Sequence, residues 1–172
     1  LASRGTQGGL SQIASAAVRL LDAIGKDLVI VETVGVGQTE LDIIGLADST
    51  IVVLVPEAGD SIQAMKAGLM EIADIFVINK ADRDGALQLS STIKNSLSLN
   101  MPDRLNWQPT IILTQAHKGK GLNELYEALS EHRNLLESDD HLEHRRRTRR
   151  LEAYKQAMFD VFKETVTNFI ES

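Results

Sequence analysis

Residues 74–82 read DIFVINKAD, and this stretch decides the fold. Four apolar residues in succession, Ile75 to Ile78, run directly into an asparagine, a lysine and, two residues later, an aspartate. A continuous apolar run of this length is typical of a strand that is covered on both faces, as in a parallel sheet. The polar residues would then lie at the carboxyl end of that strand, where parallel sheets bind their ligands.

Three further runs rich in Val and Ile have the same character: DLVIVE at 27–32, STIVVLVP at 49–56 and TIILT at 110–114. Between and around these runs, apolar residues recur at helical spacing, which predicts helices over 11–24, 61–73, 87–99 and 121–136. Strands that alternate with helices predict an α/β fold built on a parallel sheet.

The end of the chain has a different pattern. Residues 141–172 contain neither Gly nor Pro, and apolar or β-branched residues recur every three or four positions: Leu151, Tyr154, Met158, Phe162, Thr165 and Phe169. This spacing predicts one long amphipathic helix, which would cap the sheet domain or pack on another subunit. We therefore divide the chain into a sheet domain at 1–138 and a C-terminal helical arm at 139–172.

Composition narrows the function. With 172 residues and 43% hydrophobic residues, the chain can bury a real core, and the net charge of -6 argues against non-specific binding to nucleic acid or anionic membrane. The chain has no Cys, which excludes disulfides and fits a reducing compartment, so we expect a cytoplasmic protein. The basic run HRRRTRR at 144–150 is interpreted as a solvated helix face or a source of inter-subunit salt bridges rather than as a nucleic-acid patch. The four His residues do not form a metal set.

The sequence NKAD has a clear use in recognising a base. The Asp82 carboxylate can accept hydrogen bonds from both N1–H and the exocyclic amine of guanine, whereas adenine offers no such donor pair. A buried carboxylate left unpaired would reject adenine. Asn79 can brace neighbouring loops through its amide, and the stem of Lys80 can lie along the base plane. The alternative is a turn in which Asn and Asp make only local hydrogen bonds.

The stretch VETVGVGQTE at 31–40 suggests a phosphate-sensing segment. Glu32, at the end of an apolar run, can hold a magnesium-bound water. Gly35 permits a backbone N–H to approach a terminal phosphate, and Gln38 can position a water or sense that phosphate. The alternative, a flexible connection with a solvated acid at Glu32, is less favoured because NKAD follows along the chain.

Taken together, SRGTQGGL, VETVGVGQTELDI, VLVPEAGDSIQAMKAG and EIADIFVINKAD closely resemble the methylmalonyl-CoA mutase-associated GTPases of the MeaB/ArgK type. The resemblance covers nearly the whole chain. It implies a P-loop GTPase core with a C-terminal dimerisation arm, and it implies GTP, GDP and Mg²⁺ as ligands.

The resemblance also assigns residues. It implies that Glu32 replaces the Asp of the usual Asp-x-x-Gly magnesium motif. It implies that guanine is recognised by Asn79, Lys80 and Asp82, together with the loop of Gln115, Ala116 and His117, whose backbone contacts the base oxygen. The family usually has Ser at the position of Gln115, so this chain departs from the pattern there.

The family has a mobile loop that communicates with its client enzyme, and it matches Pro56 to Gly68 here. Asp60, Gln63 and Lys66 are spaced three apart, which would place them on one face of a helix start. The alternative is an N-cap at Asp60 followed by a polar helix face. For Gln63 the two interpretations are equally favoured, while signalling is favoured for Asp60 and Lys66.

A P-loop, G-x-x-x-x-G-K-S/T, does not occur in the 172 residues: Gly25-Lys26 is followed by Asp27, and Gly119-Lys120 by Gly121. We therefore expect a truncated core without the P-loop strand and helix, which alone hydrolyses GTP poorly. The expected whole protein is a homodimeric GTPase that gates cobalamin delivery to, or protects, an acyl-CoA mutase. The alternatives are a metallochaperone GTPase for nickel or cobalt, and a non-catalytic interaction module.

Overall fold

The computed structural model describes residues 9–33, 46–57, 69–99 and 107–171, and the structural statements below concern these residues. The chain divides into two compact units, Leu1–Asn134 and Leu135–Ser172. The sheet lies in the first unit. The division expected from the sequence, at 138/139, stays a prediction.

A parallel three-stranded sheet forms the centre of the first unit, in the order β1 (Ile51–Leu54), β2 (Ile75–Ile78) and β3 (Thr110–Leu113). Ile51 pairs with Ile75, and Ile75 pairs with Thr110, so the three strands are in step along their whole length. Their carboxyl ends therefore meet at one edge of the sheet, and the polar residues of the sequence motifs directly follow these ends.

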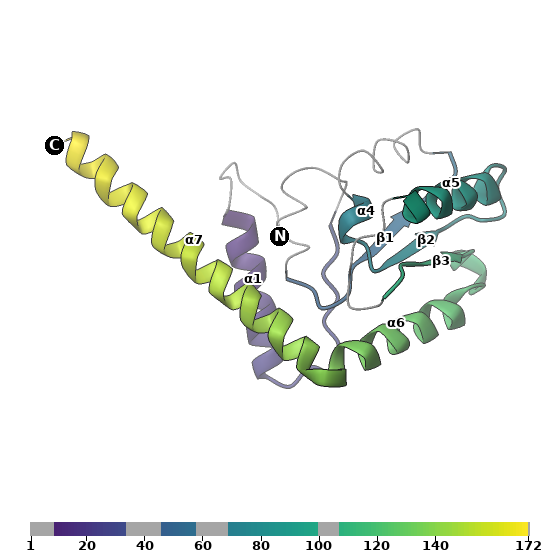
Figure 1. Cartoon of the computed structure of the whole chain (residues 1–172), viewed down its shortest axis with the longest axis horizontal. Coiled ribbons are helices and arrows are strands. Elements are labelled where there is room, and N and C mark those ends of the chain that lie inside the picture. Colours follow the sequence, from purple (N-terminus) through teal and green to yellow (C-terminus); the bar gives the residue numbers. More distant parts are fainter. Residues whose placement is uncertain (1–8, 34–45, 58–68, 100–106, 172) are drawn as a thin grey trace. The chain divides into compact units, whose positions relative to one another are not determined.

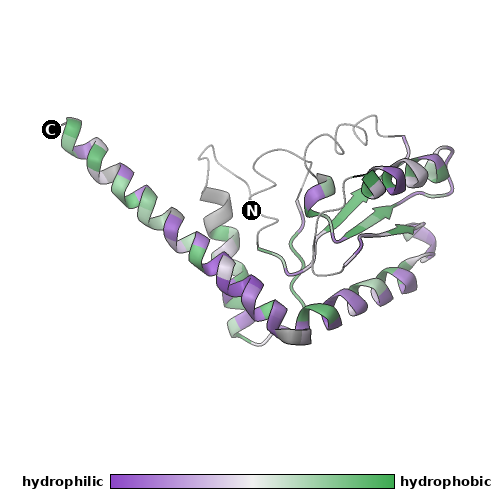
Figure 2. Ribbon diagram, viewed as in Figure 1, coloured by the Kyte–Doolittle hydropathy of each residue, from purple (hydrophilic) through white to green (hydrophobic). Residues whose placement is uncertain are grey.

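Two helices cover the two faces of β2 (Figure 1). Helix α5 (Ala86–Leu99) contributes four buried residues, Ala86, Leu89, Ile93 and Leu97, which share a core with Phe76 and Ile78. Helix α6 (Leu122–Glu137) contributes Ala128, with Leu125 and Leu129 beside it, to a second core that contains Ile75 and Val77. Because alternate residues of β2 face opposite cores, the strand has to be apolar throughout, as Figure 2 shows.

The sheet confirms three of the four expected strands. The expectation of a strand at 27–32 is wrong. Residues 28–33 belong to no helix or strand, and Leu28 and Ile30 are 77% and 81% exposed. An apolar run predicts burial, but it does not tell whether a neighbouring strand is there to hydrogen-bond with it. The coverage of β1 is also one-sided, because Val53 is 60% exposed while Val52 and Leu54 are buried.

Two other α-helices lie in the described part of the first unit. Helix α1 (Gly9–Ala23) ends as the sequence predicts, because Gly25 adopts a positive φ of 77° and the N–H of Lys26 bonds to the carbonyl of Leu21. Helix α4 (Leu69–Ile72) is the described end of the helix expected over 61–73, most of which lies outside the described residues.

The second unit contains the short helix η2 (Ser138–Asp140) and the long helix α7 (His141–Glu171). Helix α7 confirms the continuous helix expected from the absence of Gly and Pro. Among the helices of the described residues, none is long and apolar enough to cross a membrane.

Candidate functional site

Asn79 joins two loops at the carboxyl edge of the sheet. These are the NKAD loop, residues 79–82 after β2, and the 114–121 loop after β3. The Oδ1 atom of Asn79 accepts a hydrogen bond from the hydroxyl of Thr114 at 3.1 Å and another from the N–H of Ala116 at 3.2 Å. One side-chain oxygen thus fixes the spacing of the two loops, and the amide nitrogen of the same side chain remains a donor.

Main-chain hydrogen bonds extend the sheet into this region. The N–H of Asn79 donates to the carbonyl of Leu54 at 2.8 Å, and the N–H of Thr114 donates to the carbonyl of Ile78 at 2.9 Å. Beyond the strand ends, the N–H of Ala81 donates to the carbonyl of Thr114 at 3.0 Å. Both loops therefore begin on a rigid support, which is what a binding site needs to hold its geometry.

The NKAD loop turns sharply at Lys80. This residue has a φ of 56°, which is uncommon outside Gly, and the N–H of Arg83 closes the turn by donating to the carbonyl of Lys80 at 3.0 Å. Lys80 and Asp82 are both exposed, so the protein itself does not bury the carboxylate of Asp82, which is accessible to a ligand. The guanidinium of Arg83 also forms an ion pair with Glu57, in the segment that follows β1.

The 114–121 loop folds back on itself. The N–H of Gln115 donates to the carbonyl of Lys120 at 3.0 Å, while the short helix η1 (Ala116–Lys118) forms between them. Gly119 closes η1 with a φ of 69°, and its N–H bonds to the carbonyl of Ala116 at 3.1 Å. The loop is thus a small closed turn that presents Ala116 and His117, both exposed, beside the NKAD loop.

The structure brings together the six residues assigned to base recognition, because all of them lie in these two loops: Asn79, Lys80, Asp82, Gln115, Ala116 and His117. Glu32 lies apart from them in sequence, and its side chain is exposed. Among the described residues, no hydrogen bond or ion pair joins Glu32 to either loop. The other assigned residues lie outside the described ranges: Gly35, Gln38, Asp60, Gln63 and Lys66.

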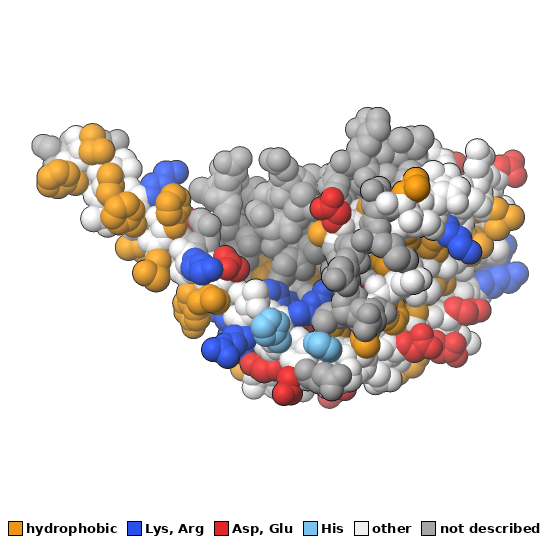
Figure 3. Space-filling model, in the orientation of Figure 1, with side chains coloured by type: hydrophobic (Ala, Val, Ile, Leu, Met, Phe, Trp, Pro, Cys, Tyr) orange, Lys and Arg blue, Asp and Glu red, His pale blue; other side chains and the backbone are white. Residues whose placement is uncertain are grey.

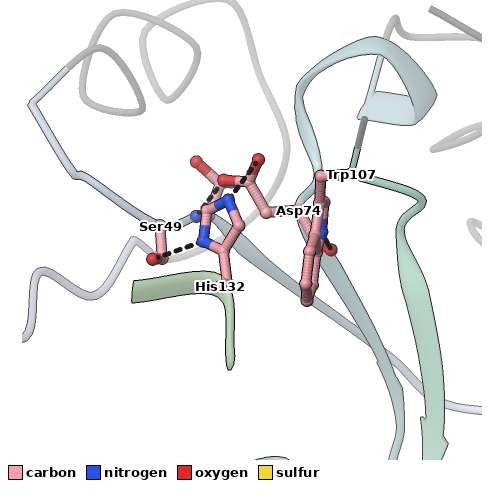
Figure 4. A network of polar contacts seen from close by, with 5 residues as sticks. Ser49, Asp74, Trp107 and His132 are labelled. Carbon is pink, nitrogen blue, oxygen red and sulfur yellow. Dashed lines mark hydrogen bonds and ion pairs between the residues drawn. The ribbon is translucent and has the colours of Figure 1, made fainter. Parts of the chain in front are cut away.

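A second polar cluster lies at the opposite, amino-terminal edge of the sheet (Figure 4). The ring of His132, from α6, has its Nδ1 2.8 Å from Ser49 Oγ and its Nε2 3.4 Å from Asp74 Oδ1. Asp74 Oδ2 accepts from the N–H of Thr50 at 2.8 Å, and its main-chain carbonyl accepts from the indole N–H of Trp107 at 2.9 Å. The residues preceding all three strands are thereby connected.

This cluster contains Ser, His and Asp, but its burial argues for a structural role. His132 and Asp74 are 2% and 3% exposed, and the ring of Trp107 packs against the imidazole with centroids 4.8 Å apart, so a substrate has no access to the ring nitrogens. Sequence reasoning missed the cluster. The available signal was the position of His132 on the apolar stripe of α6, seven residues after Leu125.

The parallel sheet, the two covering helices and the paired loops at the carboxyl edge define the class of protein. This is the α/β fold of P-loop GTPases, and a solved structure of that fold superimposes on the chain. The structure, that of the LAO/AO transport system kinase, matches with a TM-score of 0.79 at 32% identity and covers 90% of this chain and 50% of that one.

Sequence comparisons identify the family within this class. The sequence model of the family described as methylmalonyl Co-A mutase-associated GTPase MeaB matches residues 1–170, so the chain belongs to that family. A protein of Pyrococcus horikoshii that is named as a candidate GTPase is 48% identical over 151 residues, which are 87% of this chain and 48% of that protein. The GTPase ArgK of Escherichia coli K12 is 34% identical over 153 residues, 87% of this chain and 46% of ArgK. The chain thus spans about half the length of these curated relatives.

Proposed function

We propose that the NKAD loop and the 114–121 loop form a guanine-specific nucleotide site. The observation that carries this proposal is the bridge from Asn79 Oδ1 to Thr114 and Ala116, because it holds both loops in one arrangement while Asp82 stays accessible. A preorganised pair of loops loses less conformational entropy on binding a base than two independent loops would.

Each residue has a distinct role in this proposal. Asp82 accepts hydrogen bonds from N1–H and the exocyclic amine of the base, and the aliphatic stem of Lys80 lies along its plane. Asn79 uses its amide nitrogen toward the base, since its oxygen is engaged with the 114–121 loop. Gln115, Ala116 and His117 are proposed to lie on the side of the base oxygen. The N–H of His117 would donate to it, because the N–H groups of Gln115 and Ala116 already donate to Lys120 and to Asn79 Oδ1.

The proposed reaction is hydrolysis of GTP to GDP and phosphate, with Mg²⁺. Glu32 is exposed and carries oxygen donors of the kind that Mg²⁺ prefers, so it fits a magnesium ion held through water. The ion would neutralise charge on the phosphates. Gly35 and Gln38 complete the proposed phosphate-sensing segment. Because the 172 residues contain no P-loop sequence, we propose that they hydrolyse GTP slowly on their own.

The proposed purpose is to gate cobalamin delivery to, or protect, an acyl-CoA mutase in the cytoplasm. The support is the family description, which names methylmalonyl-CoA mutase. Asp60, Gln63 and Lys66 are proposed to signal to this client. The same description favours the mutase over a nickel or cobalt metallochaperone, and the named GTPase relatives favour an enzyme over a non-catalytic module.

A homodimer through α7 is also proposed. Its support is a row of large apolar side chains on a helix of 31 residues, which Figure 3 shows as orange groups along the arm. Leu151, Tyr154, Met158, Phe162 and Phe169 are between 54% and 82% exposed, and their spacing places them on one stripe. A second copy of α7 would cover such a stripe.

The experiment that tests guanine recognition is a competition measurement. A fluorescent GDP analogue is bound to the protein and displaced with unlabelled GDP or ADP, and the Asp82→Asn variant serves as the control. Displacement by GDP at concentrations where ADP has no effect, with loss of that preference in the variant, is expected. Equal displacement by GDP and ADP would contradict the proposed site.

A further inference from the structure

Gly121 lies unusually close to the end of β3. A Cβ atom built on Gly121 would be 2.2 Å from the carbonyl oxygen of Leu113, 3.0 Å from Thr114 Cγ2 and 3.1 Å from Thr114 Cα. Gly121 also has a φ of 78°, which side chains rarely adopt. Two independent features, space and backbone conformation, therefore require glycine at this position.

Neither side of this contact can yield easily. The peptide between Leu113 and Thr114 is fixed on its far side, because the N–H of Thr114 bonds to the carbonyl of Ile78 at 2.9 Å. On the other side, Gly121 directly precedes α6, and its carbonyl accepts from the N–H of Leu125 at 3.1 Å, while Leu125 packs on the core. The close approach of Gly121 thus sets where Thr114 lies.

Thr114 in turn determines the geometry of the NKAD loop. It is 2% exposed, its hydroxyl donates to Asn79 Oδ1, and its carbonyl accepts from the N–H of Ala81. We propose that Gly121 is a positioning residue for base recognition, which holds Thr114 against Asn79 and so aims the NKAD loop. This inference rests on the proposed guanine site, although Gly121 itself need not touch the nucleotide.

Gly119 offers a matched control in the same loop. Its φ of 69° is close to that of Gly121, but a Cβ atom built there meets nothing within 4 Å. Gly119→Ala therefore introduces the backbone strain alone, whereas Gly121→Ala introduces similar strain and a collision with Leu113. A difference in nucleotide preference between the two variants therefore measures the effect of the close approach of Gly121 to Leu113.

The readout is the ratio of the dissociation constant for ADP to that for GDP, measured by competition in the full-length protein. Partial unfolding weakens the binding of both nucleotides equally and leaves this ratio unchanged. A misplaced NKAD loop lowers the ratio, because it weakens the binding of GDP more than that of ADP. We expect Gly121→Ala to lower the ratio by about tenfold or more. A misplacement of about 1 Å can cost about a hundredfold in the rate of an enzyme, and base recognition depends on the same precise positioning. Gly119→Ala should leave it within about threefold. An unchanged ratio in Gly121→Ala, or an equal fall in both variants, overturns the proposal.

A second variant covers the case in which Gly121→Ala does not fold. Thr114→Val keeps the shape of the side chain but removes the hydroxyl that bonds to Asn79, so it must lower the same ratio. An unchanged ratio shows that the hydrogen bond from Thr114 to Asn79 does not aim the NKAD loop, and the proposal fails.

Hydrogen exchange separates this inference from the proposed function. Gly121→Ala, but not Gly119→Ala, should speed amide exchange at Ala81 and Ala116, whose N–H groups bond to Thr114 and Asn79. If the wild-type protein does not prefer GDP over ADP, the proposed function fails, and the exchange rates alone decide whether Gly121 positions the loops. Unchanged exchange at both amides then overturns the positioning role.

Discussion

The side-chain oxygen of Asn79 lies 3.1 Å from the hydroxyl of Thr114, so one hydrogen bond connects the carboxyl ends of the two neighbouring strands β2 and β3. The same oxygen also accepts from the N–H of Ala116. A residue that the sequence assigns to ligand recognition is therefore also part of the framework, and the two roles can be separated by mutation.

Asn79→Ala should destabilise the folded state. The substitution removes the acceptor of two donors, and the hydroxyl of Thr114 is buried, so the expected loss is about 1–3 kcal/mol of unfolding free energy. Asn79→Asp retains an acceptor oxygen and should lose much less stability, although it lacks the amide donor and should weaken guanine binding. Chemical denaturation of the two variants measures this difference. Equal stability of Asn79→Ala and the wild type would show that the bridge is not a structural element.

Asp74→Ala should also be destabilising, through the cluster at the other edge of the sheet. It removes the acceptor of the Thr50 N–H and the carboxylate beside the buried ring of His132, which costs about 1–3 kcal/mol or more. Asp84→Ala is the matched control, because Asp84 is exposed in the same unit. Denaturant midpoints of the two variants are compared. Similar midpoints would mean that the cluster contributes little to stability.

Two leucines of α5 provide a test of the core. Leu89 is 8% exposed and packs with Phe76 and Ile93, whereas Leu87, two residues earlier on the same helix, is 72% exposed. Leu89→Ala should lower the unfolding free energy by about 2–5 kcal/mol, because it loses apolar burial and leaves a cavity. Leu87→Ala should change it by less than about 0.5 kcal/mol. Thermal unfolding of both variants measures the difference, and comparable losses would contradict the assignment of the buried face.

The sequence predicts the part of the fold that depends on local pattern. The four apolar residues of β2 predict a strand with two covered faces, and both cores are found there. The apolar run at 27–32 has the same pattern and forms no strand, because a strand also needs a hydrogen-bonding neighbour, which no local pattern reveals. The same limit applies to Val53, which is exposed although its run is continuous.

In the candidate site, too, local sequence predicts some features, and only the folded chain reveals the others. The residue types in NKAD predict base chemistry, since a carboxylate and an amide have defined hydrogen-bonding abilities. The requirement for glycine at position 121 does not follow from local sequence, because the atom that excludes a side chain belongs to Leu113, in the preceding strand. The connection from Asp74 to His132 spans α5 and β3 in sequence, and only the folded chain brings them together.

The proposed dimer predicts that a charge on the apolar stripe of α7 shifts the protein toward monomer. Phe162→Glu places a carboxylate where a second helix would bury the ring, and burying an unpaired charge is costly. Thr167→Glu adds the same charge on the other side of the helix and should leave the mass unchanged. Sedimentation equilibrium over a range of concentrations gives the mass. A monomeric wild-type protein at all concentrations would contradict the dimer.

Asp82→Asn should change which base is preferred, provided that the carboxylate recognises guanine as proposed. Guanine presents two donors, N1–H and the exocyclic amine, and an amide side chain cannot accept both, so GDP should bind at least about tenfold more weakly. Xanthine has an oxygen in place of the amine, and the amide nitrogen of the introduced asparagine side chain can donate to it. Binding of xanthosine diphosphate should therefore improve as binding of GDP declines.

The exposed position of Asp82 makes this a specific test, because the substitution should have little effect on the folded state. Asp84→Asn, two residues further on and also exposed, is the matched control and should leave the preference for GDP over xanthosine diphosphate unchanged. Competition against a fluorescent GDP analogue gives both affinities. If both nucleotides bind the Asp82→Asn variant as they bind the wild type, Asp82 does not contact the base. The NKAD loop would then be a turn whose polar residues serve the backbone alone.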